Sequence, residues 1–188
     1  MCGRWTLSDI SKLAARFDVE ASAVKPRFNI APTQQAFIVP EPHKLAAQKW
    51  SLSLGKFTVI NTRAESISKP IYSAAKPCLV PADGFYEWKP AGSSKVPYRI
   101  TLKSGELFAF AGLHDGNGFS IITVEPNDTV SKIHSRMPAI LLREDEIGWL
   151  TGRNVEVLKP YAGELKAYQV SPLVNNVRND SRELIQPA

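Results

Sequence analysis

The residues of this chain best suited to chemistry begin at the second position, where a cysteine follows the initiating methionine in MCGRW. If Met1 is removed, Cys2 carries a free α-amine beside its thiol, and only an N-terminal cysteine can present this 1,2-aminothiol. The reference pKa is about 7.7–8.0 for the amine and about 8.5 for the thiol, so each group has a reactive fraction near neutral pH. Such a pair attacks acyl carbons, and it condenses with aldehydes to an imine and then to a thiazolidine. The alternative is that Cys2 is an ordinary residue of a frayed terminus.

Two further clusters contain groups that could transfer protons. The stretch PADGFYEWK places Glu87 between Tyr86 and Trp88, and HSRMP places His134 and Arg136 before the apolar run AILL. A carboxylate within an aromatic run is expected to be partly desolvated, which raises its pKa and suits it to general acid–base catalysis. Histidine titrates near neutral pH and commonly serves the same purpose.

A third cluster, NTRAES, gathers Asn61, Arg63 and Glu65 after the apolar run FTVI. Each cluster also has a purely structural interpretation. Asn61 could form a turn, Glu87 could be an ion-paired strand residue, and His134 could cap a helix or hydrogen-bond within a loop. Considered singly, these residues do not distinguish a site from a scaffold.

The composition is that of an ordinary globular protein, with 188 residues, 44% of them hydrophobic and 22% charged. The sequence has neither an apolar run of about 18 residues nor a signal-peptide pattern, so a soluble, intracellular protein is expected. The net charge of +5 is compatible with a polyanionic partner such as nucleic acid, and equally with a solvated basic face. Cys78 lies in an apolar stretch and is expected to be buried. The three histidines lack metal-ligand spacing, so neither a metal nor another cofactor is expected.

The coarse pattern of elements predicts one α+β domain over residues 1–188, built on a mainly antiparallel, barrel-like sheet with peripheral helices. Apolar residues at helical spacing predict a helix over residues 8–18 with Ser8 as its N-cap. A second helix is predicted over 143–152, and a loop over 27–35. Short runs rich in apolar and β-branched residues predict strands at 36–40, 46–54, 77–82, 97–102, 106–113, 118–124 and 164–171.

Taken together and in order, the polar motifs resemble a known family. MCGR, RFNIAPTQ, NTRAES, DGFYEWK, HSRMP and NNVRND followed by ELIQP are similar to the motifs of the SOS response-associated peptidase family. Members of this family are also called abasic-site processing proteins. The resemblance runs from Cys2 almost to the last residue, so it covers nearly the whole chain.

The resemblance implies recognition of abasic sites in single-stranded DNA and a covalent link to them through Cys2 after loss of Met1. The Cys2 amine would attack the aldehyde of the opened sugar to give an imine, and the thiol would close a thiazolidine. Asn61 would hydrogen-bond near the Cys2 amine, and His134 would stabilise the sugar hydroxyl or assist ring opening. Glu87 would shuttle protons during formation and reversal of the adduct and during autoproteolytic removal of Met1.

The resemblance also implies a set of DNA contacts. Arg4, Arg63 and Arg136 would contact phosphates flanking the lesion, which positions the strand without reading its sequence. Thr123 is a weaker candidate for a contact with the DNA backbone. Pro32 would act as a wedge against a neighbouring base, or would simply stiffen its loop. The protein is expected to act as a DNA-associated monomer in the cytoplasm.

One segment departs from the family pattern. Relatives usually carry a tryptophan-rich stretch before the Asn-Arg-Glu motif, whereas this chain has KWSLSLGKFTVIN. Trp50 corresponds to the tryptophan expected in the core. The aromatic residue expected to stack on a base is therefore missing unless Phe57 replaces it.

Two other functions remain open at this point. Cys2 with His134 is compatible with a cysteine peptidase, or N-terminal nucleophile hydrolase, that acts on other substrates. A DNA-binding module that senses lesions without covalent chemistry would also use the basic residues. The sequence leaves open whether strand cleavage by β-elimination, a lyase activity, competes with ring closure.

Overall fold

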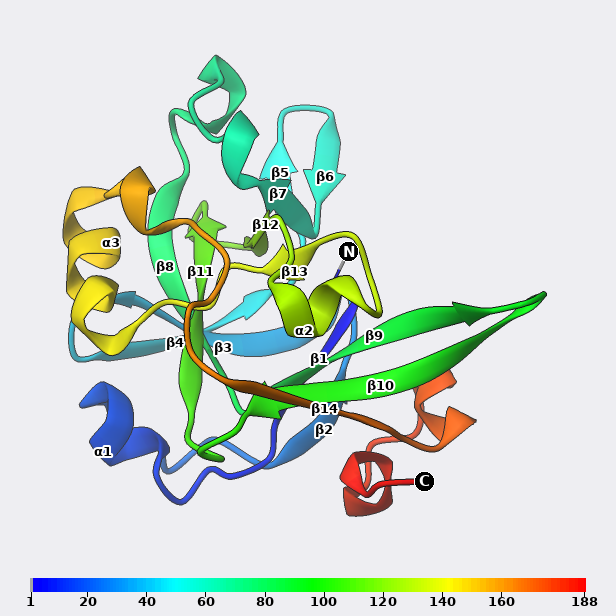
Figure 1. The fold of residues 1–188 in the computed structure, drawn as a ribbon. Coiled ribbons are helices and arrows are strands. Elements are labelled where there is room, and N and C mark those ends of the chain that lie inside the picture. The colour runs from blue at the N-terminus through cyan, green and yellow to red at the C-terminus, as the bar shows by residue number, and fades with distance from the viewer. Residues whose placement is uncertain (1) are drawn as a thin grey trace.

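A computed structural model of the chain describes residues 2–188, and antiparallel strands make up most of it (Figure 1). The strands are β1 (Arg4–Leu7), β2 (Arg27–Ile30), β3 (Gln35–Glu41), β4 (Lys44–Lys49), β5 (Leu52–Leu54), β6 (Phe57–Val59), β7 (Asn61–Arg63), β8 (Lys76–Ala82), β9 (Gly84–Ala91), β10 (Ser94–Leu102), β11 (Phe108–His114), β12 (Phe119–Val124), β13 (Met137–Pro138) and β14 (Leu165–Gln169). The α-helices are α1 (Leu13–Phe17), α2 (Asp128–Ser131) and α3 (Glu146–Gly152). The 3₁₀ helices are η1 (Ala64–Ser66), η2 (Pro70–Tyr72), η3 (Arg143–Asp145), η4 (Val155–Val157), η5 (Pro172–Asn175) and η6 (Arg182–Ile185).

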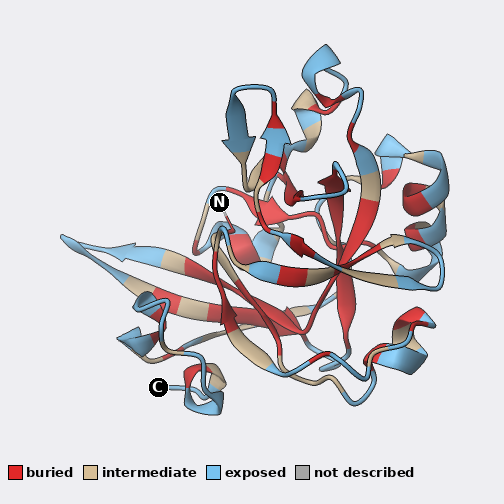
Figure 2. Ribbon diagram, turned by 180° about the vertical axis from the view of Figure 1, so that it is seen from behind, coloured by how far each residue is buried: buried red, intermediate tan, exposed pale blue. Residues whose placement is uncertain are grey.

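The strands of residues 2–188 form two sheets and one hairpin. One sheet has the order β14-β10-β9-β1-β2. The other follows the order β13-β12-β11-β8-β3-β4, and β7 joins it by pairing in parallel with β12. The remaining hairpin is β5–β6, and the long β9–β10 hairpin extends away from the rest of the molecule (Figures 1 and 2). The predominantly antiparallel architecture is confirmed, but these sheets do not close into a barrel, so the barrel-like expectation is not confirmed.

Aromatic side chains fill the space between the two sheets. Trp5 of the five-stranded sheet packs edge-on against Phe110 of the other sheet at 6.3 Å between ring centroids. Trp50 lies 6.3 Å from Trp5 and stacks on Phe119 at 6.5 Å. Buried residues therefore concentrate where the sheets meet, while the tip of the β9–β10 hairpin is exposed (Figure 2). Trp50 is fully buried, which confirms its predicted place in the core.

A buried polar network holds β1 beside the point where the chain passes from one sheet to the other. Asp83 lies between β8 and β9 and accepts hydrogen bonds from the hydroxyl of Thr6 and from the backbone N–H of Ser8. It also accepts a hydrogen bond of 3.0 Å from Arg99. A Cβ atom on Gly84 would come within 2.8 Å of the Arg99 guanidinium, so glycine permits this close approach. The network fixes the strand that follows Cys2.

Most of the predicted elements are present, with corrections. Strand β1 was not predicted, and the strand predicted at 46–54 is divided between β4 and β5. The first helix covers only Leu13–Phe17, and Ser8 does not cap it, because the Ser8 hydroxyl and N–H both donate to Asp83. The first half of the predicted 27–35 loop is strand β2, which pairs with β1. The central strand β9 was not predicted, since Gly84, Glu87 and Pro90 interrupt its apolar pattern. The helix predicted over 143–152 is confirmed as η3 and α3.

Candidate functional site

Cys2 is fully buried in the chain that begins at Met1, and it leads directly into β1. Its Sγ atom lies 3.7 Å from the carbonyl oxygen of Arg4, to which the thiol donates. Burial raises the pKa of the thiol, and the nearby negative charge of Glu87 raises it further. The thiol is therefore held in its protonated form, so its use as a nucleophile requires a partner that removes the proton. Met1 lies outside the described residues.

Asn61 contacts Cys2 directly. Its side-chain amide donates a hydrogen bond of 2.7 Å to the Cys2 carbonyl oxygen. Two interactions hold the strand that carries Asn61: Trp50 Nε1 donates to the Ile60 carbonyl at 2.8 Å, and the hydroxyl of Thr62 contacts Ser120 Oγ at 2.8 Å. The parallel pairing of β7 with β12 thus brings a residue 59 positions away to the N-terminus.

Glu87 lies just beyond the end of the β1–β9 ladder, whose last pair joins Arg4 to Tyr86. Alternate residues of a strand point to opposite faces, so Glu87 lies on the same face as the core residue Phe85. Only 2% of Glu87 is exposed, and desolvation raises its pKa to about 7. The prediction of a desolvated carboxylate is confirmed. Near neutral pH this group is present in both its acid and base forms, which suits it to proton transfer in either direction.

His134 faces Glu87, with 3.9 Å between its Nε2 atom and Glu87 Oε2. His134 Nδ1 lies 3.1 Å from the backbone nitrogen of Arg136 and 3.2 Å from its carbonyl oxygen, so the Arg136 backbone holds the ring with Nε2 directed to Glu87. Desolvation lowers the pKa of His134, which keeps the ring neutral at neutral pH. The structure therefore brings together Cys2 with Asn61 and Glu87 with His134, and the charge of Glu87 acts on the Cys2 thiol.

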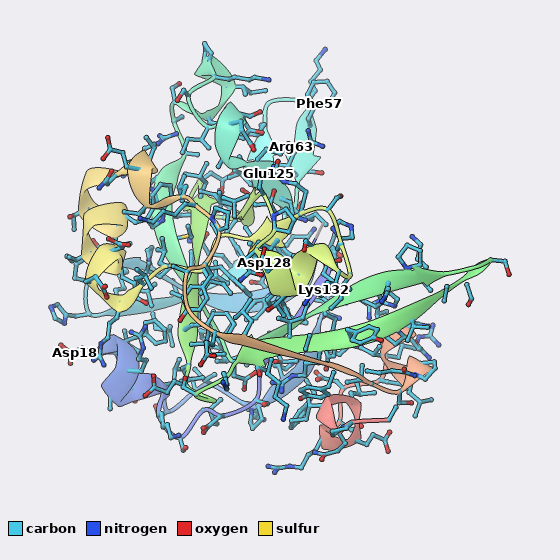
Figure 3. The ribbon with its side chains drawn as sticks, in the orientation of Figure 1. Asp18, Phe57, Arg63, Glu125, Asp128 and Lys132 are labelled. Atoms are coloured by element: carbon cyan, nitrogen blue, oxygen red, sulfur yellow. The ribbon has the colours of Figure 1, made fainter. Side chains whose placement is uncertain are left out.

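The three predicted phosphate-binding arginines have different surroundings. Arg63 is exposed on the strand that carries Asn61 (Figure 3). Arg4 is partly buried and donates to Asn29 Oδ1 at 2.9 Å and to the Asn175 carbonyl at 3.1 Å, so it fastens the C-terminal segment to β1. Arg136 is only 8% exposed and binds carboxylates of the protein itself. Arg63 is thus the arginine of the three that is most accessible to a phosphate.

Pro32 lies beside a surface hollow of about 520 Å³ that Gly3, Arg4 and Trp88 also line. The residue after it, Thr33, is β-branched yet has a φ of 69°, in the left-handed region. Hydrogen bonds hold this turn, among them one of 3.0 Å from the Thr33 N–H to the Trp50 carbonyl. Pro32 is therefore presented by a fixed turn at the rim of a hollow next to the N-terminus.

Thr123 does not present its side chain to solvent, since the residue is fully buried. Its carbonyl oxygen accepts a hydrogen bond of 2.7 Å from Arg136.

Phe57 and Trp88 are aromatic residues with exposed or partly exposed side chains. Phe57 is 69% exposed on the β5–β6 hairpin, above Arg63 in the view of Figure 3. Trp88 is partly exposed beside the hollow, with the Arg4 guanidinium 5.9 Å from its ring centroid. In the sequence, Trp88 stands out only as a neighbour of Glu87. Strand alternation places the two side chains on opposite faces, and that signal identifies Trp88 as a separate feature.

Other chemical groups lie apart from this site. Cys78 is fully buried, as predicted, and burial raises the pKa of its thiol. Within residues 2–188, no group of three or more His, Cys, Asp or Glu side chains is arranged to hold a metal ion. No helix within the same residues has the length and apolar character needed to cross a membrane.

Comparison with known proteins identifies the family. The model of the SOS response associated peptidase (SRAP) family matches residues 1–177. The chain belongs to the SRAP family. It is 38% identical to the abasic site processing protein YoqW of Bacillus subtilis over an alignment that covers 99% of both chains. It is 39% identical to YoaM of the same organism, also named an abasic site processing protein, over 98% of this chain and 97% of YoaM.

A more distant relative has the same kind of name, and a solved structure shares the fold. The abasic site processing protein HMCES of Gallus gallus is 33% identical over 70% of this chain and 51% of its own length. A crystal structure of a protein from Bacteroides thetaiotaomicron has the same fold, with a TM-score of 0.85 at 24% identity over the whole of both chains. The alignment with YoqW spans 225 positions against the 188 residues of this chain, so this SRAP protein lacks residues that YoqW carries.

Proposed function

We propose that this SRAP protein recognises abasic sites in single-stranded DNA and forms a covalent thiazolidine crosslink to them through Cys2 after Met1 is removed. The observation that carries the proposal is the site itself. A cysteine at the second position is hydrogen-bonded by Asn61 and lies within the field of a desolvated carboxylate, Glu87, that faces a neutral histidine. The names of the relatives, which are abasic site processing proteins, support DNA with abasic sites as the substrate.

The proposed reaction needs no oxidant, reductant or metal. The Cys2 amine adds to the C1′ aldehyde of the opened sugar, and one water leaves as the imine forms. The Cys2 sulfur then adds to the imine carbon, and the thiol proton is transferred to the nitrogen. Glu87 removes and returns these protons, and His134 hydrogen-bonds the sugar hydroxyl. Asn61 holds the Cys2 carbonyl, so the amine and thiol are oriented together.

Two further activities follow from the same groups. Removal of Met1 hydrolyses the Met1–Cys2 peptide bond: water adds to the Met1 carbonyl carbon, and the departing Cys2 amine takes a proton, which Glu87 supplies. Reversal of the crosslink requires protonation of the departing sulfur and addition of water to the imine, and Glu87 performs both transfers. The proposal therefore includes autoproteolysis and self-reversal, and a lyase activity arises wherever the imine undergoes β-elimination before the ring closes.

A denaturing gel separates this function from the alternatives. Protein whose N-terminus is verified by mass spectrometry is incubated with a single-stranded oligonucleotide that carries one abasic site. We expect a protein–DNA band that survives denaturation. A complex seen only on native gels would support a non-covalent lesion-binding module. Cleavage of added peptides without a DNA adduct would support a peptidase acting on other substrates.

Arg63 is expected to contribute to DNA affinity through phosphate contact. Arg63→Ala should weaken binding to any single-stranded DNA and reduce the slope of log K against log salt by about 0.7, the value for one phosphate contact on a single strand. The rate of crosslinking at saturating DNA should change little. The control is Lys103→Ala. It removes one exposed positive charge directly after the C-terminal end of β10. Intact binding combined with lost crosslinking would contradict the phosphate role.

Phe57 is expected to replace the missing stacking residue. Base–aromatic stacking contributes about 1–3 kcal/mol per base, so Phe57→Ala should raise the dissociation constant for single-stranded DNA by roughly 5- to 150-fold. Phe57→Trp should retain affinity, because it keeps an aromatic face at the same place. Fluorescence anisotropy with a labelled oligonucleotide measures the effect. An unchanged dissociation constant for Phe57→Ala would show that this side chain does not contact a base.

A further inference from the structure

Asn29 is a fully buried polar residue of β2, the strand that pairs with β1. Its Oδ1 atom accepts a hydrogen bond of 2.9 Å from Arg4 Nη1. Its Nδ2 atom lies 3.2, 3.2 and 2.8 Å from three backbone carbonyl oxygens of the C-terminal segment, those of Val174, Asn176 and Asn179. A guanidinium only donates and a carbonyl only accepts, so these partners use both ends of the amide. Asn29 therefore joins β1, through Arg4, to the C-terminal segment, which lies beside β2 in Figure 1.

The Arg4 guanidinium uses only part of its hydrogen-bonding capacity within the protein. Arginine has five N–H donors. Nη1 of Arg4 donates to Asn29 and to the Val174 carbonyl, and Nη2 donates to the Asn175 carbonyl at 3.1 Å. Among residues 2–188 these are its hydrogen-bond acceptors, so Nε and Nη2 each retain one N–H group. These two nitrogens form one edge of the planar guanidinium, and such an edge can bind a phosphate through two parallel hydrogen bonds.

Arg4 lies where a DNA strand held at Cys2 would pass. The two residues are two positions apart, at most about 7 Å along the backbone. Arg4 lines the hollow beside the N-terminus together with Pro32 and Trp88. The C-terminal segment also holds the Trp88 ring, because Trp88 Nε1 donates a hydrogen bond of 2.8 Å to Asn175 Oδ1. The partly exposed guanidinium is thus fixed at the edge of a space open to a ligand.

We propose that Asn29 is a positioning residue for DNA binding. Together with the carbonyl groups of residues 174 and 175, it fixes the Arg4 guanidinium so that the edge formed by Nε and Nη2 meets a phosphate next to the lesion. The inference rests on the proposed function, which supplies the DNA strand. A long side chain that is ordered before binding loses less conformational entropy when the ligand arrives. The C-terminal segment therefore contributes to DNA affinity through Arg4.

A double-mutant cycle separates positioning of Arg4 from a general effect on the fold. Asn29→Ala removes the acceptor of Arg4 and the donor to the three carbonyls. It should raise the dissociation constant for single-stranded DNA roughly 10-fold, a loss typical of a weakened hydrogen bond to a charged group. Arg4→Ala should raise it at least as much. Asn29→Ala added to Arg4→Ala should change the affinity by less than about twofold, because no guanidinium remains to be positioned.

The measurement is fluorescence anisotropy with an oligonucleotide that carries a tetrahydrofuran analogue of the abasic site. This analogue has no aldehyde, so covalent chemistry does not contribute to the dissociation constant. Asn29→Ser is a milder truncation and serves for the same cycle if Asn29→Ala does not fold. Its hydroxyl lies closer to the backbone than the amide does, so it should weaken binding in the same direction. Thermal melting confirms that each variant is folded.

Tyr168→Phe is the matched control. The Tyr168 hydroxyl donates a hydrogen bond of 2.9 Å to the Ile185 carbonyl, so its loss loosens the same C-terminal segment at a point that does not contact Arg4. The affinity of this variant for the analogue should stay within about twofold of wild type. A loss as large as that of Asn29→Ala would mean that any loosening of the segment weakens binding, and it would overturn the specific role of Asn29.

Three other results would overturn the inference. Asn29→Ala could cause the same loss with and without the Arg4 side chain, which would show that Asn29 acts independently of Arg4. Arg4→Ala, or both folded Asn29 variants, could bind with wild-type affinity. The proposed function fails separately: wild type that binds the analogue but does not crosslink to a true abasic site contradicts that function and leaves the cycle to decide the role of Asn29. Wild type that binds no single-stranded DNA contradicts both.

Discussion

Cys2→Ala is expected to leave no heat-stable adduct with abasic DNA, because a thiazolidine cannot form without the thiol. The amine of the new N-terminal alanine can still form an imine, which borohydride reduction would trap. Retention of Met1 should have an effect at least as large, since it removes the amine itself. The measurement is the yield of the denaturation-resistant band for each protein, with and without borohydride.

The control is Cys78→Ala, which removes the other buried thiol of the chain. Cys78 lies in β8, within the core, so this variant should crosslink at the wild-type level as long as it remains folded. A normal yield of heat-stable adduct from Cys2→Ala, or its loss from folded Cys78→Ala, would eliminate the proposed mechanism.

Glu87→Gln is expected to form the adduct more slowly than wild type. It should release the adduct about 10²- to 10⁴-fold more slowly than wild type, since a positioned acid–base group usually contributes that much rate. The asymmetry arises because amines and thiols react with aldehydes unaided, whereas the departing sulfur needs a proton in a site that excludes solvent. The assay is a chase of preformed adduct with excess unlabelled abasic oligonucleotide. The N-terminus must first be verified, since the same change should impair removal of Met1.

The pH dependence of release tests the same assignment. Desolvation raises the pKa of Glu87 to about 7, so its acid form is lost as pH rises through that value. Release by wild type should therefore slow as pH increases across neutrality, and Glu87→Gln should flatten this dependence. Glu164→Gln, which changes an exposed carboxylate paired with Lys103, is the matched control. Equal release rates for wild type and a correctly processed Glu87→Gln protein would exclude Glu87 as the group that drives reversal.

Local sequence patterns predicted those features that depend on neighbours along the chain. The aromatic flanks of Glu87 predicted its desolvation, and the apolar surroundings of Cys78 predicted its burial. Strand β9 was missed because its polar and glycine residues belong to the site and to the Asp83 network rather than to a hydrophobic pattern. These residues occupy positions where an apolar residue would have indicated a strand, so the apolar pattern did not predict β9.

Features that depend on distant residues were not accessible in this way. Arg4 donates to residue 175 and Arg136 pairs with residue 65, partners that no local pattern indicates, while their expected phosphate contacts stay predictions. Ser8 resembled a helix cap, yet Asp83, 75 positions away, takes both of its donors. The charge and type of these side chains are evident from sequence, whereas their partners are set by how the sheets and the C-terminal segment come together.

The central claim, capture of an abasic aldehyde by the Cys2 aminothiol, is tested most directly by the mass of the crosslinked product. Protein lacking Met1 is incubated with an abasic oligonucleotide, denatured, weighed intact, and then digested after treatment with a thiol-alkylating reagent. The account predicts the summed mass of protein and oligonucleotide less one water, with the DNA on the peptide that begins at Cys2 and its sulfur protected from alkylation. Attachment of the DNA at any other residue would contradict the account. Alkylation of the Cys2 sulfur in the intact adduct would contradict it as well.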